Sequence, residues 1–279
     1  MFNLSFYHIF VTLIMTLQII AAITFAMLGL SGPVGLIIGG ALYFALPVFI
    51  FIKVSAQKTA KTLSFKRLST SNMLYTVALS VSVYPLALIL SAITSIFFTN
   101  HIPEVVGGMA AQVNPLIMFA AFALSPAFFE EILLRGMLAK PLMHLGFKGA
   151  LLNGLYFGLI HLNPHQFFYA FALGVLLYYM LILTGSIWAP ILSHFIINSL
   201  ALILFFWLPL LQEGQDMAVW FFIVSPIAFV FLLKNFIQKN RHRLEEKEDL
   251  PPPEGPMITP SFVLMISVYI FIVFSFSLF

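Results

Sequence analysis

Three short patterns place ionisable or amide side chains within strongly apolar sequence. They are Glu130, Glu131 and Arg135 in FFEEILLRG, His161 in FGLIH, and His194 with Asn198 in HFIIN. A carboxylate and an imidazole can together hold and deprotonate a water molecule. A second imidazole and an amide can donate hydrogen bonds to a developing oxyanion. These residue types could therefore hydrolyse an acyl bond by activated water, without a covalent intermediate.

The two adjacent glutamates are expected to have different roles. Glu131 and Arg135 are four residues apart, so on a helix they lie on one face and can form an ion pair. Pairing offsets most of the cost of burying both charges. Glu130 lies about 100° around the helix from Glu131, because a helix has about 3.6 residues per turn, and it has no partner at that spacing. Glu131 is thus interpreted as structural and Glu130 as available for chemistry.

A helical hairpin is expected to bring Glu130 level with His161. The sequence midpoint between them falls inside the turn LGFKG at 145–149. In two antiparallel helices joined there, both residues lie roughly 20 Å from the tip of the turn, at about 1.5 Å of rise per residue. Phe157 precedes His161 by four residues and projects from the same face.

A third helix carries His194 and Asn198, which are four residues apart and point the same way. Pro190 falls in the expected first turn of that helix, where proline is tolerated. His194 is about 13 Å from the preceding turn, and Glu130 is about 15 Å from Lys140, a marker of the membrane interface. The three groups are therefore expected to meet at a similar depth. Asn153 is a further buried polar candidate.

Composition places these patterns in a membrane protein. Hydrophobic residues make up 61% of the 279 residues and charged residues only 8%, against about 25% charge in a typical soluble domain. The chain has no cysteine, which excludes disulfides, a cysteine nucleophile and thiolate metal sites. The fold is expected to be an all-α bundle of about eight to nine membrane spans in one domain, 1–279. Spans are predicted near 5–29, 34–54, 73–98, 114–139, 149–162, 166–184, 188–210, 217–233 and 257–279.

The distribution of Lys and Arg predicts the topology. Five of the 13 lie between Lys53 and Arg67, and seven more fall at 140–148 and 234–256. Since cytoplasmic loops are enriched in Lys and Arg, these segments are expected on the cytoplasmic side. The amino terminus is then cytoplasmic, the carboxyl terminus is outside if there are nine spans, and 234–256 is a charged, proline-rich cytoplasmic linker. The catalytic pocket is expected to open toward the cytoplasmic side.

The three patterns also resemble a family. EEILLR (130–135), FGLIH (157–161) and HFIIN (194–198) match Glu-Glu-x-x-x-Arg, Phe-x-x-x-His and His-x-x-x-Asn motifs, in this order. Together they look like the CPBP intramembrane glutamic endopeptidases, a group with type II CAAX prenyl proteases and bacteriocin-processing or immunity-related membrane proteins. The resemblance covers about 114–200. It implies that Glu130 and His161 activate water and that His194 and Asn198 form an oxyanion hole. Glu131 and Arg135 would support the site, and Phe157 would help line it.

Other classes stay open at this point. His161, His194 and one glutamate could be ligands of a zinc peptidase, although the sequence has no His-Glu-x-x-His pair. A non-enzymatic immunity or peptide-binding membrane protein could use the same polar pocket, and a transporter could use Glu130 for proton coupling. For the peptidase, no cofactor or metal is expected. The expected partners are membrane lipid and a prenylated or otherwise hydrophobic peptide substrate, with no nucleic acid.

Overall fold

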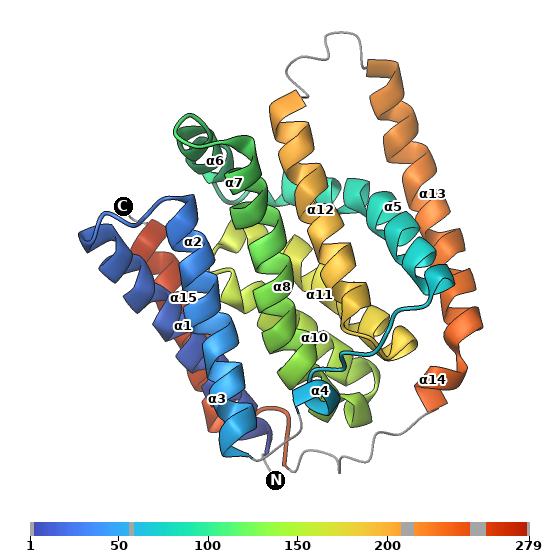
Figure 1. Cartoon of the computed structure of the whole chain (residues 1–279), viewed down its shortest axis with the longest axis horizontal. Helices are drawn as coiled ribbons and strands as arrows, with labels where there is room; N and C mark the ends of the chain where they lie inside the picture. Colours follow the sequence, from blue (N-terminus) through green and yellow to red (C-terminus); the bar gives the residue numbers. More distant parts are fainter. Residues whose placement is uncertain (1–2, 56–58, 208–214, 246–254, 278–279) are drawn as a thin grey trace.

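The chain forms a bundle of tilted helices, shown as a computed structural model in Figure 1. The structure describes residues 3–55, 59–207, 215–245 and 255–277, and within these ranges there are helices and no strands. The element bounds are α1 Leu4–Met27, α2 Pro33–Gly40, α3 Leu46–Val54, α4 Thr59–Thr62, α5 Thr70–Thr94, α6 Ile102–Ala110, α7 Pro115–Phe119, α8 Ser125–Glu131, α9 Ala139–Leu142, α10 Phe147–Ile160, α11 Pro164–Thr184, α12 Trp188–Trp207, α13 Gln215–Asn240, α14 His242–Glu245 and α15 Pro260–Ser277. The predicted all-α membrane bundle is confirmed.

Seven helical runs in the described residues are long and apolar enough to cross a membrane. They are Leu4–Met27, Pro33–Val54, Thr70–Thr94, Pro115–Leu145, Pro164–Thr184, Trp188–Phe206 and Phe221–Asn240. The predicted spans near 149–162 and 257–279 correspond to shorter apolar helices, α10 and α15. The sequence thus identified each apolar helix of ten or more residues in the described ranges, although two of the nine are shorter than the others, and it did not predict the short helix α6.

Two of the long runs are continuous helices with wider, π-helical turns. These turns are Ala41–Ala45, Ala120–Leu124 and Ile132–Leu138. Each is followed within three residues by a proline, at positions 47, 126 and 141. Proline has no backbone N–H and its ring clashes with the carbonyl four residues earlier, so the preceding turn widens instead of closing normally. A widened turn accommodates each of these prolines without ending the helix, whereas Pro85 in α5 and Pro226 in α13 lie inside helices without one.

Several predicted boundaries were wrong in the same direction. The helix predicted to end at 139 runs on to Leu145, so Lys140 lies in α9 and is buried, not in a turn. The helix predicted at 217–233 extends through Asn240, so Lys234 and Lys239 belong to α13 and not to a linker. Long Lys side chains can reach the interface from a helix end, so a charge does not terminate the helix. The proline-rich part of the predicted linker, 246–254, lies outside the described residues.

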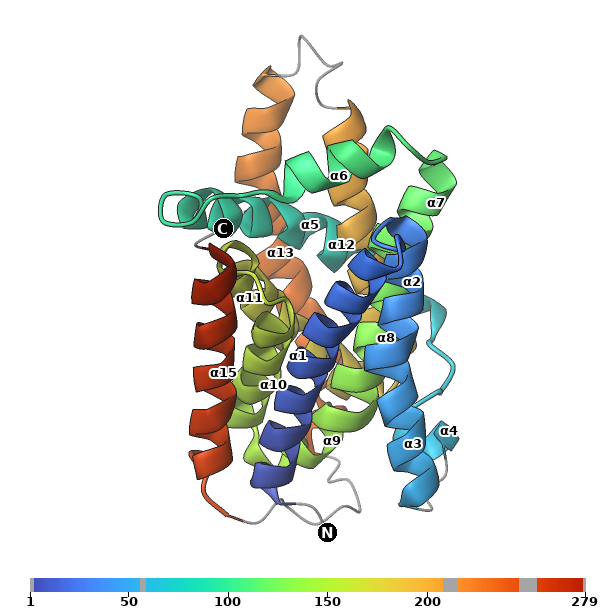
Figure 2. The same cartoon turned by 90° about the vertical axis from the view of Figure 1, so that its left-hand side faces the viewer.

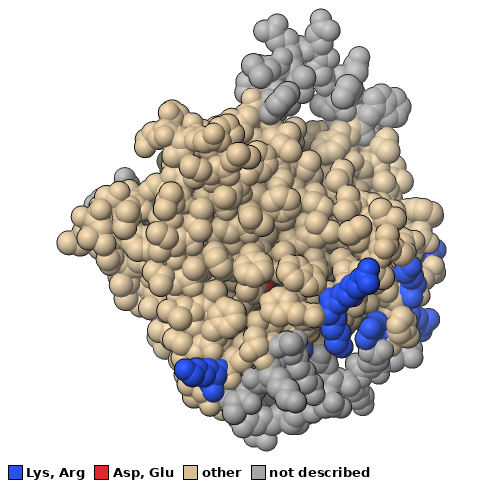
Figure 3. Space-filling model, viewed as in Figure 1, with Lys and Arg blue, Asp and Glu red and all other residues tan. Residues whose placement is uncertain are grey.

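The two ends of the bundle differ in charge and in shape. α1 begins at one end and α15 finishes at the other, while α6 lies across the second end (Figure 2). On the face shown in Figure 3, Lys and Arg gather at the end where α1 begins. The described basic residues of that end include Lys53, Lys66, Arg67, Lys148, Arg241 and Arg243. We call it the basic end, and the other the α6 end.

Candidate active site

Glu131 is the centre of a buried polar network. Its Oε1 accepts a hydrogen bond from Arg135 Nη1 at 3.0 Å, which confirms the predicted ion pair. The same oxygen lies 2.9 Å from Nδ1 of His194, a contact that the sequence did not predict. Both Glu131 and Arg135 have fully buried side chains. Because a buried charge is stable only when paired and hydrogen-bonded, Glu131 holds both the arginine and the histidine in place.

Arg135 connects this network to a neighbouring helix. Its Nη2 donates to the carbonyl oxygen of Gly174 on α11 at 2.8 Å. At the same residue α10 and α11 pack closely, since a Cβ at position 174 would lie 2.9 Å from the Cα of Gly154. Small residues at such a crossing let two membrane helices approach. Gly174 is thus a site residue that sequence analysis missed, although its glycine in an apolar helix was a visible signal.

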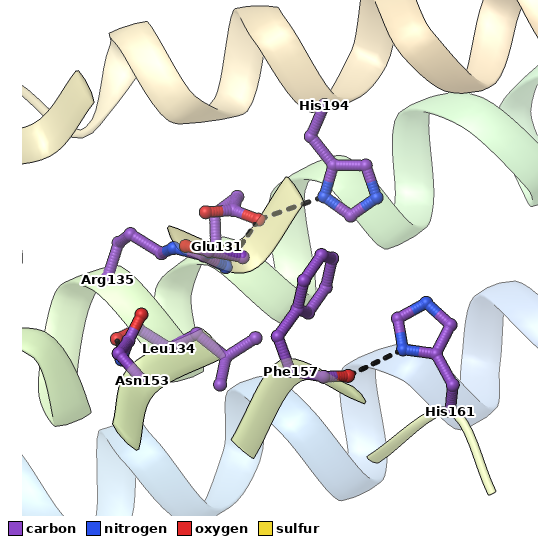
Figure 4. A network of polar contacts seen from close by, with 8 residues as sticks. Glu131, Leu134, Arg135, Asn153, Phe157, His161 and His194 are labelled. Atoms are coloured by element: carbon purple, nitrogen blue, oxygen red, sulfur yellow. Dashed lines mark hydrogen bonds and ion pairs between the residues drawn. The ribbon is translucent and has the colours of Figure 1, made fainter. Parts of the chain in front are cut away.

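Phe157 separates the two histidines. Its ring meets the His161 ring edge-on at 4.8 Å and the His194 ring edge-on at 5.4 Å between centroids (Figure 4). The guanidinium carbon of Arg135 lies 4.7 Å from the centre of the same ring. Phe157 therefore packs against both imidazoles and against the guanidinium of Arg135.

The backbone fixes the orientation of His161. Its Nδ1 lies 2.7 Å from the carbonyl oxygen of Phe157, one turn earlier. A carbonyl only accepts, so Nδ1 donates, and in the neutral imidazole Nε2 carries the lone pair. His161 caps the end of α10, since Leu162 has a positive φ of 51° and Asn163 begins the next helix as its N-cap. The predicted position near the end of a span is confirmed.

One cavity brings the predicted residues together. It has a volume of about 570 Å³ and is lined by Glu130, Phe157, His161, His194 and Asn198, among others. In Figure 3, the acidic colour visible on that face lies in a recess near its centre. The hairpin that sets this arrangement turns at Gly146, where the sequence predicted it, with φ of 54°. Residues as far apart in the sequence as Glu130 and Asn198 therefore line the same cavity.

Glu130 differs from its neighbour in lacking a partner. Its Oε2 is buried and makes no hydrogen bond to any part of the chain that the structure describes. Glu131, by contrast, accepts from two side chains through Oε1. Oε2 of Glu131 also lacks a partner among the described residues, but Glu131 does not line the cavity. A buried carboxylate oxygen without a donor is costly, so Glu130, which faces the cavity, is the group suited to hold a water or a substrate proton.

Asn153 has a structural position. Its Nδ2 donates to the carbonyl oxygen of Leu134 at 3.0 Å, within the π-helical turn that follows Glu131. This bond ties α10 to the preceding helix at its π-helical turn. Asn153 does not line the cavity.

Three further polar residues of α11 line the cavity and were missed: His165, Gln166 and Tyr169. His165 Nε2 lies 2.9 Å from Ser95 Oγ, and Gln166 Nε2 donates to the Tyr169 hydroxyl at 2.9 Å. His165 follows His161 by four residues, which on a continuous helix would signal a shared face. The helix break at Asn163–Pro164 removes that rule, so the sequence gave no sign of their common cavity.

The zinc alternative can be compared with the geometry. Within the described ranges, no group of three or more His, Cys, Asp or Glu side chains is arranged to hold a metal ion. Nδ1 of His194 is directed at Glu131 and Nδ1 of His161 at a carbonyl.

Comparison with known proteins gives one match. The family model of the type II CAAX prenyl endopeptidases, described as Rce1-like, matches residues 112–200. No match was found among curated proteins or solved structures. The matched region contains all three motifs and agrees with the resemblance that they carry. It implies a membrane peptidase of the CAAX prenyl endopeptidase type.

Proposed function

We propose that this protein is an intramembrane glutamic endopeptidase that hydrolyses a peptide bond with water activated by Glu130 and His161. One observation carries the proposal: of the two adjacent glutamates, Glu131 is held through Oε1 by Arg135 and His194 and does not line the cavity, whereas Glu130 lines it with an oxygen that has no partner in the described residues. The family match supports the peptidase class.

The proposed reaction begins with a water in the cavity. Glu130 takes a proton from it while Nε2 of His161 holds it by accepting its other hydrogen. The resulting hydroxide oxygen forms a bond to the carbonyl carbon, and the carbonyl π electrons move onto oxygen. When the tetrahedral species collapses, the C–N bond breaks, and the proton held by Glu130 passes to the leaving amine. Glu130 therefore ends the cycle as a carboxylate.

The oxyanion is stabilised by His194 and Asn198. Nδ1 of His194 donates to Glu131, so in the doubly protonated ring Nε2–H is free to donate to the oxyanion. The Asn198 amide, from the same cavity wall, supplies a second donor. Glu131 and Arg135 act by positioning His194, and do not contact the substrate.

The proposed substrate is a prenylated CAAX-type chain or a hydrophobic leader peptide. A lipid tail would enter sideways between helices, and the peptide would reach the cavity from water. Lys and Arg gather at the basic end, where α1 begins, and cytoplasmic segments of membrane proteins are enriched in these residues. The proposed topology therefore places the amino terminus in the cytoplasm.

Hydrolysis by purified protein in lipid nanodiscs tests the proposal. Prenylated CAAX peptides and hydrophobic leader peptides are incubated with wild type, Glu130→Gln, His161→Gln and the matched control Glu104→Gln. We expect the first two variants to lose at least about 10²-fold in rate, because a positioned general base contributes that much or more. Glu104 is exposed and does not line the cavity, so its variant should cleave like wild type.

Two results would contradict the proposal. If wild type binds these peptides but cleaves none of them, the protein is a peptide-binding or immunity protein and not an enzyme. If a chelator abolishes cleavage and zinc restores it, the zinc alternative replaces the glutamate mechanism.

A further inference from the structure

Helix α12 carries two of the proposed site residues, His194 and Asn198, in a sequence that is otherwise apolar except for Ser193 and Ser199. Between membrane helices, van der Waals packing and interhelical hydrogen bonds supply the specificity of association. A rotation of α12 about its axis would carry His194 away from Glu131, because the direction of a helical side chain turns by about 100° per residue. The contacts that orient α12 therefore decide where the imidazole of His194 points.

Ser193, directly before His194, is hydrogen-bonded to α5. Oγ of Ser80 donates to Oγ of Ser193 at 2.8 Å, and both side chains are fully buried. The Ser80 oxygen also lies 2.6 Å from the carbonyl oxygen of Thr76, one turn earlier, which holds the Ser80 side chain in its rotamer. Helix α5 lies outside residues 112–200, the region that the family model matches.

Two hydrogen bonds from successive residues thus hold α12 from two sides. Ser193 is bonded to Ser80 of α5, and Nδ1 of His194 lies 2.9 Å from Glu131 of α8 (Figure 4). A helix held at one point can still pivot about that point, whereas two bonds that leave it about 100° apart fix its rotation and its axial position together. Losing the first bond would leave only the imidazole itself to resist the pivot at this level.

The start of α12 is held at a different level. Ile187 N donates to the Ser64 carbonyl at 3.1 Å, and Ser186 Oγ donates to the Lys66 carbonyl. Ile187 precedes His194 by seven residues, which is about two helical turns. These bonds anchor the end of the helix, and the Ser80–Ser193 bond anchors it beside the site.

The Ser80–Ser193 bond lies just behind the cavity wall. His194 lines the cavity, whereas Ser193 and Ser80 do not. On α5 the lining residues begin with Tyr84, one turn after Ser80. Neither serine can therefore touch a molecule in the cavity, and any effect on the reaction must act through the helix that bears His194.

We infer that the Ser80–Ser193 hydrogen bond positions His194 for the reaction by fixing the rotation of α12, an inference that rests on the proposed function. In that function Nε2 of His194 donates to the oxyanion, and such a donor works only where it is aimed at the developing charge. Ser80 and Ser193 are thus positioning residues, outside the three motifs and, for Ser80, outside the family match.

Removing the bond from either side tests this role. Ser193→Ala removes it from α12, and Ser80→Ala removes it from α5 without changing α12. Ser82→Ala is the matched control, because Ser82 is a buried serine of the same helix whose Oγ donates within that helix, to the Leu79 carbonyl at 3.2 Å. These variants and the Ser80→Ala/Ser193→Ala double variant are assayed with peptide in lipid nanodiscs, and rates are given per folded protein.

We expect kcat to fall about tenfold in each single variant of the pair, because misplacing a catalytic group by about 1 Å can cost up to about 100-fold. KM should change by less than about twofold, since an oxyanion donor acts in the transition state. The double variant should lose no more than either single one, because all three lack the same bond. Unchanged kcat in both single variants, or losses that multiply in the double variant, would overturn the inference.

A second readout needs no substrate. The ring nitrogens of His194 are observed by NMR in protein with isotope-labelled histidine, and their signals are assigned with His194→Gln. We expect the Nδ1 signal to move in Ser80→Ala and Ser193→Ala and to stay in Ser82→Ala, because the bond to Glu131 is strained only when α12 can turn. A signal that stays in all three variants would overturn the inference. If wild type cleaves no peptide but the signal moves as expected, the proposed function fails and the positioning of His194 stands.

Discussion

The half of the bundle near the basic end and the half near the α6 end are both built from apolar helices, but they are packed differently. Near the basic end, Leu133, Leu134 and Leu138 are fully buried in a packed layer. Toward the α6 end the helices leave a cavity of about 570 Å³. Gln18, Glu130 and His165 all line it, and each has a buried polar atom without a partner in the described residues. Unpartnered buried atoms also occur outside the cavity, on Glu131, Arg135 and Asn153, but each of these side chains is fixed by another hydrogen bond. The unpartnered atoms of the hollow half line a space in which water or substrate can satisfy them.

The Arg135 network lies at the boundary between the halves, and breaking it should have the largest effect on stability. Arg135→Ala would leave Glu131 buried with only His194 as a partner, at a cost of about 3–5 kcal/mol. We expect a large fall in thermal stability, measured by unfolding in detergent, together with loss of hydrolysis. Glu130→Gln, one position from Glu131, is the control and should keep wild-type stability. Equal destabilisation by both variants would contradict the different roles assigned to the two glutamates.

The packing of the basic end can be broken without touching a polar group. Leu63→Ala would open a void beside Gly136 and cost about 2–5 kcal/mol, as core Leu→Ala changes do. The same variant should make an introduced cysteine at Leu134 react with a water-soluble maleimide from the basic end. Leu63→Met keeps the volume and serves as the matched control. No change in labelling would show that Leu63 does not close this end.

The smallest effect is expected on the lipid-facing surface. On α13, Ile227 is 68% exposed, so Ile227→Ala removes no contact with the protein core. Its unfolding free energy in detergent should stay within about 0.5 kcal/mol of wild type, as surface substitutions usually do. Ile132→Ala, with a fully buried side chain of the same type, is the comparison and should cost several times more. A large effect at Ile227 would indicate that α13 packs against another protein surface.

Local sequence patterns account for most features of the fold that were predicted correctly. Apolar length identified the helices, and Gly146, Pro164 and Pro190 lie at helix boundaries as expected from backbone geometry. The Glu131–Arg135 pair followed from a spacing of four on one helix. Charge was a poorer guide to boundaries, since Lys140, Lys234 and Lys239 lie inside helices that continue past them. Their flexible side chains allow this.

What the sequence determined by itself is therefore short in range: helices, turns and the groups that face one another within a helix. The three motifs also identified the residues that the tertiary structure brings to one cavity. Only that structure decided that His194, 63 residues away, faces Glu131, and that the Gly174 carbonyl meets Arg135. It also decided that the cavity lies toward α6, on the side away from the basic residues. Helix tilt and packing set these contacts, and the long helices are all so apolar that hydropathy does not say which neighbour each will meet.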